Sequence, residues 1–161
     1  MFERVTAAAV LALAVSAPLG AQQFDGVNVN WGVHVAYPEY LSGSIGVNVS
    51  AASGREERRG YFIRFEPGYY GGRLNFGRYT GIENGMYSTH VGVMQTWNGG
   101  PGMGPSTTYL GAEQRVTIAG IEAGIGYYFR TSGTTNALLS GSNNSAPFGV
   151  LTFILGANFF R

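Results

Sequence analysis

The chain has 161 residues, and only 12% of them are charged, where an average soluble domain has about 25%. All ten basic residues are arginine, and nine acidic residues leave a formal net charge of +1. This balance argues against nucleic-acid binding, and an aromatic content of 14% argues against a disordered chain. The absence of cysteine excludes a disulfide scaffold and any thiolate metal site. Twenty-six glycines with so little charge indicate β-structure or a membrane protein.

Residues 1–21 are predicted to form a secretory signal peptide of the bacterial type. A short polar start precedes an apolar run from Val5 to Ala17, and small residues precede Gln22. The run is shorter than the roughly 20 residues of a spanning helix, which disfavours the alternative of an uncleaved anchor. We expect cleavage after Ala21, which leaves residues 22–161 as a single domain.

Apolar and polar residues alternate along eight segments after the signal peptide, which predicts eight β-strands and no helix. Clusters of glycine, proline, serine and asparagine separate the segments. The two longest connections, 98–106 and 131–146, each join an odd-numbered strand to the next even-numbered one. Both are therefore expected at the same end of an up-and-down barrel, on the extracellular side of a membrane barrel. The predicted strands cover 27–35, 44–50, 61–66, 73–79, 87–97, 110–115, 121–130 and 148–160.

One face of the predicted strands is polar and rich in glycine. Glycine weakens a solvent-facing strand, but small residues suit the interior of a narrow eight-stranded barrel. The same face carries nearly balanced charges, which should pair inside a barrel because an unpaired buried charge is costly. This predicted ionic cluster consists of Arg64, Glu66, Arg73, Glu113, Arg115, Glu122 and Arg130.

The opposite face is apolar and carries its large aromatic residues near the strand ends. Rings at both rims are typical of the interfacial girdles of membrane barrels. A soluble barrel has the same alternation with the opposite face outward, so alternation alone leaves both arrangements open. The predicted aromatic girdle consists of Tyr37, Tyr61, Tyr69, Tyr79, Tyr87, Trp97, Tyr127, Phe129 and Phe159.

Two terminal segments, YLGAEQRVTIAGIEAGIGYYFR and FGVLTFILGANFF, look like consecutive last strands of small outer-membrane barrels. Over residues 26–160 the chain resembles the eight-stranded OmpA/OmpX-like group in the broad sense. The resemblance implies an all-β, antiparallel, up-and-down transmembrane barrel in the bacterial outer membrane. It also implies contact with membrane lipid and recognition by the barrel assembly machinery, and Gly156 and Phe159 fit such a recognition signal.

The ionic cluster is the main candidate for a functional site. One interpretation is a plug of salt bridges that fills the interior and fixes strand register. The other is a gate or narrow charged pore. An eight-stranded barrel has room for little more than its own side chains, which favours the plug.

Ser88 and His90 share the polar face of the fifth predicted strand, and Glu83 precedes them. A serine hydrolase needs its base within hydrogen-bond reach of the nucleophile. The Cβ atoms of Ser88 and His90 should lie roughly 6–7 Å apart along a strand. This spacing disfavours catalysis, so we expect no enzyme. The only other histidine, His34, is expected to form hydrogen bonds inside the barrel, and the spacing predicts no metal site or cofactor.

The run Arg55–Arg59 is the most charged stretch. Its simplest interpretation is a solvated turn, and the alternative is a contact to another envelope component or to lipid phosphate. Together these features predict a structural or surface-interaction protein, with loops 98–106 and 131–146 available to a surface ligand. The alternatives are a secreted soluble barrel that binds a small apolar ligand and, less favoured, a lipid-acting envelope hydrolase.

Overall fold

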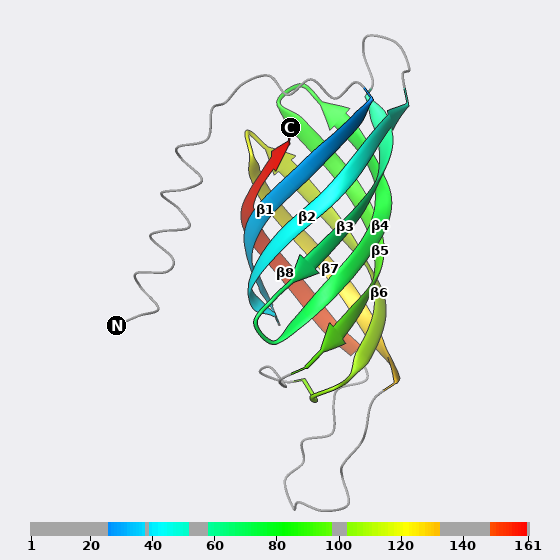
Figure 1. The fold of residues 1–161 in the computed structure, drawn as a ribbon, viewed down its shortest axis with the longest axis vertical. Coiled ribbons are helices and arrows are strands. Elements are labelled where there is room, and N and C mark those ends of the chain that lie inside the picture. Colours follow the sequence, from blue (N-terminus) through cyan, green and yellow to red (C-terminus); the bar gives the residue numbers. More distant parts are fainter. Residues whose placement is uncertain (1–25, 38, 52–57, 98–102, 133–148, 161) are drawn as a thin grey trace, which may run out of the picture.

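The computed structural model describes residues 26–37, 39–51, 58–97, 103–132 and 149–160, so the predicted signal peptide lies outside the described part. Eight antiparallel strands follow one another in up-and-down order and form a closed barrel (Figure 1). The predicted all-β, eight-stranded class is confirmed. The strands are β1 (Val27–Tyr37), β2 (Tyr40–Ala51), β3 (Arg59–Pro67), β4 (Gly71–Ile82), β5 (Gly85–Thr96), β6 (Thr108–Ile118), β7 (Ile121–Ser132) and β8 (Gly149–Phe160).

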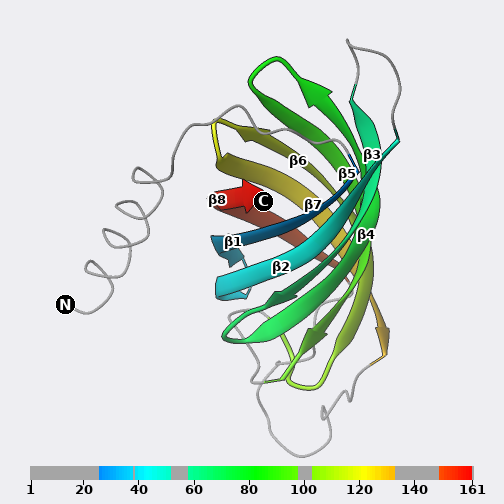
Figure 2. The same cartoon turned by 45° about the horizontal axis from the view of Figure 1, so that its top comes forward.

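The barrel closes through the pairing of β1 with β8. Their ladder runs from Asn30 opposite Phe160 to Tyr37 opposite Phe153, and Figure 2 shows the two strands side by side. Closure leaves no open sheet edge, so each strand has a hydrogen-bonded neighbour on both sides.

Several strands are longer than alternation predicted. The second was expected from Ser44 but begins at Tyr40, where Leu41 already pairs with Val35 of β1. The β6–β7 turn is only two residues long. Ala119 and Gly120 both have positive φ values, 50° and 83°, as a tight type I′ hairpin requires. Short turns of this kind extend the ladders into residues that sequence analysis assigned to loops.

The two ends of the barrel differ. The start of β1, the end of β8 and the β2–β3, β4–β5 and β6–β7 connections share one end, here called the terminal end. The other four connections share the opposite end, here called the loop end (Figure 1). The predicted loops 98–106 and 131–146 both join strands at the loop end, although residues 98–102 and 133–148 lie outside the described part.

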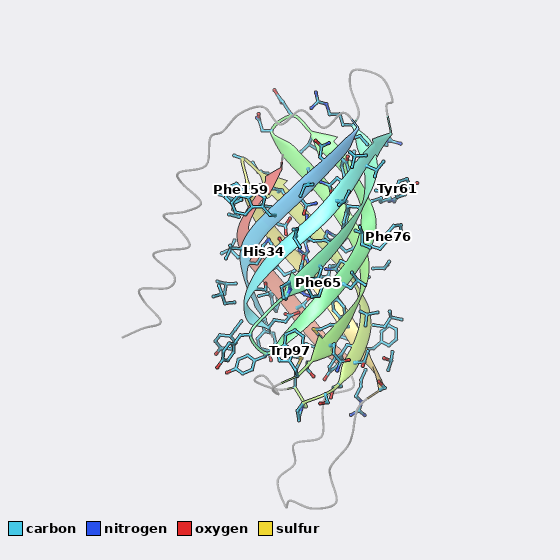
Figure 3. The ribbon with its side chains drawn as sticks, viewed as in Figure 1. His34, Tyr61, Phe65, Phe76, Trp97 and Phe159 are labelled. Carbon is cyan, nitrogen blue, oxygen red and sulfur yellow. The ribbon has the colours of Figure 1, made fainter. Side chains whose placement is uncertain are left out.

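The buried, inward side chains include most of the polar and charged ones together with a smaller apolar set, whereas most large apolar side chains point out. Along β3, for example, Phe62, Arg64 and Glu66 are buried, while Tyr61 and Ile63 are exposed. Figure 3 shows apolar rings such as Phe65 and Phe76 projecting away from the ribbon. Within the described residues, no helix has the length and apolar character needed to cross a membrane.

The interior is narrow enough to require glycine. A Cβ atom on Gly111 of β6 would meet the backbone oxygen of Tyr127 and the side chain of Tyr128 on β7. Gly43 lies on the outward face of β2, and a Cβ there would find its nearest atom 3.9 Å away, in ordinary contact. Glycine is therefore a steric requirement inside the barrel, at this position at least.

Candidate functional site: the buried ionic network

Arg115 of β6 is the centre of an ionic network inside the barrel. Its guanidinium binds Glu66 of β3 in bidentate fashion, with Nη1–Oε1 and Nη2–Oε2 distances of 2.6 and 2.8 Å. The same group donates to Glu113 from Nε at 2.8 Å and to Glu122 of β7 from Nη1 at 2.9 Å. Arg115 thus joins three carboxylates, and all four side chains are buried.

Glu122 organises the part of the network that faces β1 and β8. Arg64 Nη1 donates to both of its oxygens at 2.9 and 3.0 Å. Asn158 Nδ2 of β8 donates to Oε2 at 2.8 Å, and His34 Nε2 of β1 lies 3.2 Å from Oε1. Thr117 Oγ1 adds a donor at 3.2 Å. Side chains from four other strands therefore contact the Glu122 carboxylate.

Arg73 of β4 extends the network toward the loop end. It forms an ion pair with Glu113 and another with Glu39, whose Oε1 lies 2.6 Å from Arg73 Nε. Glu39 lies in the β1–β2 connection and is fully buried. Burial raises the pKa of its carboxyl above the ordinary value of 4.5, while the adjacent Arg73 opposes this rise.

The network contains three arginines and four glutamates, so it carries one more formal negative charge than positive. Six of its members are residues of the predicted ionic cluster. The seventh predicted member, Arg130, is only half-buried and lies beside Tyr109 near the loop end, away from the described ion pairs of this network. Glu39 takes part instead, and sequence reasoning missed it because it lies in a connection rather than on an alternating strand.

Small apolar clusters lie on both sides of the network. At the loop end, Met103 packs with side chains of β5 to β8. At the terminal end, Phe62, Tyr79 and Met86 pack together, and the Phe62 ring lies 4.5 Å from that of His90. The loop-end cluster consists of Met94, Met103, Tyr109, Tyr128 and Val150. The ionic network thus lies between two small apolar clusters, in an interior that also holds buried asparagine, serine and threonine side chains.

Ser88 and His90 do contact each other. Ser88 Oγ and His90 Nε2 are 2.8 Å apart, so the prediction that strand spacing keeps them out of reach is wrong. Side chains on a strand can lean along its direction and close such a gap. Both residues are buried, however, whereas Glu83 is exposed in the β4–β5 turn. The structure therefore brings together a serine and a histidine, but not the acid proposed with them.

The predicted aromatic girdle lies mostly on the outer surface. Tyr37, Tyr61, Tyr69, Tyr87, Trp97, Tyr127 and Phe129 are exposed. Phe159 is half-buried against Trp31, with ring centroids 4.5 Å apart. Tyr79 does not belong to this set: it points inward, is only 2% exposed, and its hydroxyl lies 2.8 Å from Ser50 Oγ. It shares the inward face of β4 with Arg73 and Asn75. The even spacing of these three residues along the strand already indicated this in the sequence.

The remaining predicted features bear less on the site. Residues 55–57 of the charged run lie outside the described part, and Arg58 and Arg59 are exposed. Within the described residues, no group of three or more histidine and acidic side chains is arranged to hold a metal ion. Comparisons with models of protein families, with curated proteins and with solved structures found no match.

Proposed function

We propose that the chain is an integral outer-membrane β-barrel protein with a structural or surface-interaction role. The observation that carries the proposal is the reversed polarity of the barrel. Arginine and glutamate are buried inside, while large apolar side chains cover the outside, such as Ile45 and Leu155 at 58% and 60% exposure. Such a surface is costly in water and favourable in lipid, where a closed barrel also satisfies every backbone group.

The packing of the interior supports a barrel whose lumen is blocked by side chains rather than an open pore. Side chains from opposite walls meet directly, as where Arg64 of β3 reaches Glu122 of β7. Apolar clusters pack at both ends of this layer. We propose that the network acts as a plug that ties the strands together, and that residues of the loop end contact surface ligands.

Two alternatives are less well supported. A soluble barrel that carries an apolar ligand needs an apolar interior, whereas the described interior has charged side chains at its centre. A hydrolase needs access to its nucleophile, whereas Ser88 is only 1% exposed. A lipid-release assay should therefore give the same result for the native protein, Ser88→Ala and His90→Ala. Activity lost in both variants would contradict a non-enzymatic role.

The two tryptophans provide a direct test of the membrane proposal. Trp31 and Trp97 both face outward, at 48% and 42% exposure, and Trp97 lies near the loop end (Figure 3). In vesicles made with brominated phospholipids, the bromine atoms should quench the fluorescence of both tryptophans. The variants Trp31→Phe and Trp97→Phe each leave one tryptophan, so that its quenching can be measured alone. The protein should also fractionate with membranes and migrate differently on gels with and without boiling. Recovery of folded protein in the soluble periplasmic fraction would contradict the proposal.

The plug is tested separately by conductance. In planar bilayers the purified protein should give no stable, large conductance, because the network occupies the interior. Steady channels whose conductance changes in Glu113→Ala or Arg64→Ala would show that the network lines a pore instead.

A further inference from the structure

A polar row crosses the outer surface of β3 to β6, between outward positions that are mostly apolar. Strand pairing places Arg78 of β4 between Tyr61 of β3 and Thr89 of β5, and Gln114 of β6 follows Thr89. Arg78 is exposed. Among the described strand residues, it is the only charged side chain that faces outward apart from Arg59, at the first position of β3. A charge placed there is costly in lipid unless something binds it.

The Thr89 and Gln114 side chains of this row are hydrogen-bonded to each other. The Tyr87 hydroxyl donates to Gln114 Oε1, and Thr89 Oγ1 donates to the same oxygen at 3.0 Å. Within the part of the chain that the structure describes, the Arg78 guanidinium has neither a carboxylate partner nor a hydrogen bond. Its five N–H donors are available to an anionic ligand.

An apolar row lies directly beside the polar one. Two residues further from the terminal end, Ile63, Phe76 and Val91 pair across the same three strands. Their exposed fractions are 50%, 55% and 53%. A step of two residues along a strand is about 6–7 Å. Figure 3 shows Tyr61 and Phe76 projecting from the same side of the barrel, with Phe76 further from the terminal end.

We propose that Arg78 binds the phosphate of an anionic membrane phospholipid, whose acyl chain lies over Ile63, Phe76 and Val91. Guanidinium groups bind phosphate oxygens in bidentate fashion, and tyrosine rings are favoured at the headgroup level. Arg59, two residues before Tyr61 on β3, places a second positive charge near the Tyr61 end of the row. This inference rests on the proposed function, because only a membrane brings this surface into contact with lipid.

The test measures lipid retained by the full chain after refolding in uncharged detergent micelles. Phosphatidylglycerol is added at increasing concentration, and the bound lipid is counted by native mass spectrometry. Arg78→Gln should weaken retention about tenfold, in line with the loss of one charge-assisted contact. Phe76→Ala should weaken it as well, because the acyl chain loses its apolar support. Arg130→Gln removes the same charge near the other end and should leave retention unchanged.

Three results would overturn the inference. The first is equal retention by the native protein and Arg78→Gln. The second is displacement of the lipid by millimolar inorganic phosphate with no effect of Phe76→Ala, which would indicate a site for free phosphate. The third is self-association in lipid-free micelles that Arg78→Gln abolishes, which would assign the row to a second copy of the chain. If Arg78→Gln still inserts into membranes and shows the boiling-dependent gel shift, the proposed function survives any of these outcomes.

Discussion

The interior and the outer surface of this barrel are built from the same strands, yet they follow opposite rules. Inside, Arg115 bonds three carboxylates and is 1% exposed, while outside, Leu155 is 60% exposed. A charge is tolerated inside because partners from opposite walls surround it. A large continuous apolar surface on the outside is favoured where the surroundings are themselves apolar. The two faces of the barrel wall therefore differ in polarity, and this difference is what supports the membrane proposal.

Removing the centre of the network should give the largest effect. Arg115→Met leaves Glu66, Glu113 and Glu122 without their shared guanidinium, and breaking a buried ion pair costs about 3–5 kcal/mol. The free energy of unfolding, measured by urea titration in lipid vesicles, should fall by that amount. Arg130→Met removes a half-buried arginine outside the network and should cost clearly less. Equal losses would show that the network does not hold the strands together.

Placing a charge on the outer surface tests what that surface faces. In vesicles, Leu74→Arg should cost about 2–4 kcal/mol because it puts arginine in the apolar face four residues beyond Arg78, between the two rims. Ile82→Arg makes the same change at the last residue of β4, near the terminal end, where the cost falls to about 0–1 kcal/mol. Titration of both variants in vesicles measures the difference. Two small and equal costs would favour a barrel that is surrounded by water.

Two glycines separate the steric demands of the two faces. Gly111→Ala places a methyl group against the backbone of Tyr127 and the side chain of Tyr128, which should cost about 1–3 kcal/mol. Gly43→Ala lies on the outer face, with its nearest atom at 3.9 Å, and should change stability little. Urea titration under identical conditions provides the comparison. A destabilising Gly43→Ala or a neutral Gly111→Ala would contradict the narrow interior.

The smallest effect concerns Glu39, which lies outside the strands. Because burial raises the pKa of its carboxyl in the folded chain, the folded state binds a proton more readily than the unfolded state does. Stability should therefore fall as pH rises from about the ordinary pKa of 4.5 through the raised value. Glu39→Gln should flatten this pH dependence of the unfolding free energy, and Glu83→Gln, at an exposed turn, should leave it unchanged. An equally steep profile in Glu39→Gln would assign the dependence to other groups.

The sequence by itself determined the strand number, the polar and apolar faces, and the joining of both long loops to strands at the same end. These properties follow from a period of two residues, which each strand carries locally. Alternation also placed Arg64, Glu66, Arg73, Glu113, Arg115 and Glu122 on one polar face, and the glycines and balanced charges of that face indicated that it points inward. The same parity could have placed Tyr79 there, but its position near a strand end suggested the girdle instead.

Only the tertiary structure decided which of those charges meet. Arg64 and Glu122 are 58 residues apart and lie on strands that are not neighbours, so no local pattern connects them. Their contact depends on how the barrel closes and on the stagger of its strands, which set the distance across the interior. The same closure buries Glu39 from a connection and leaves Arg130 half-buried near the loop end. Strand patterns are local, whereas a network across a barrel forms only when all eight strands are in place.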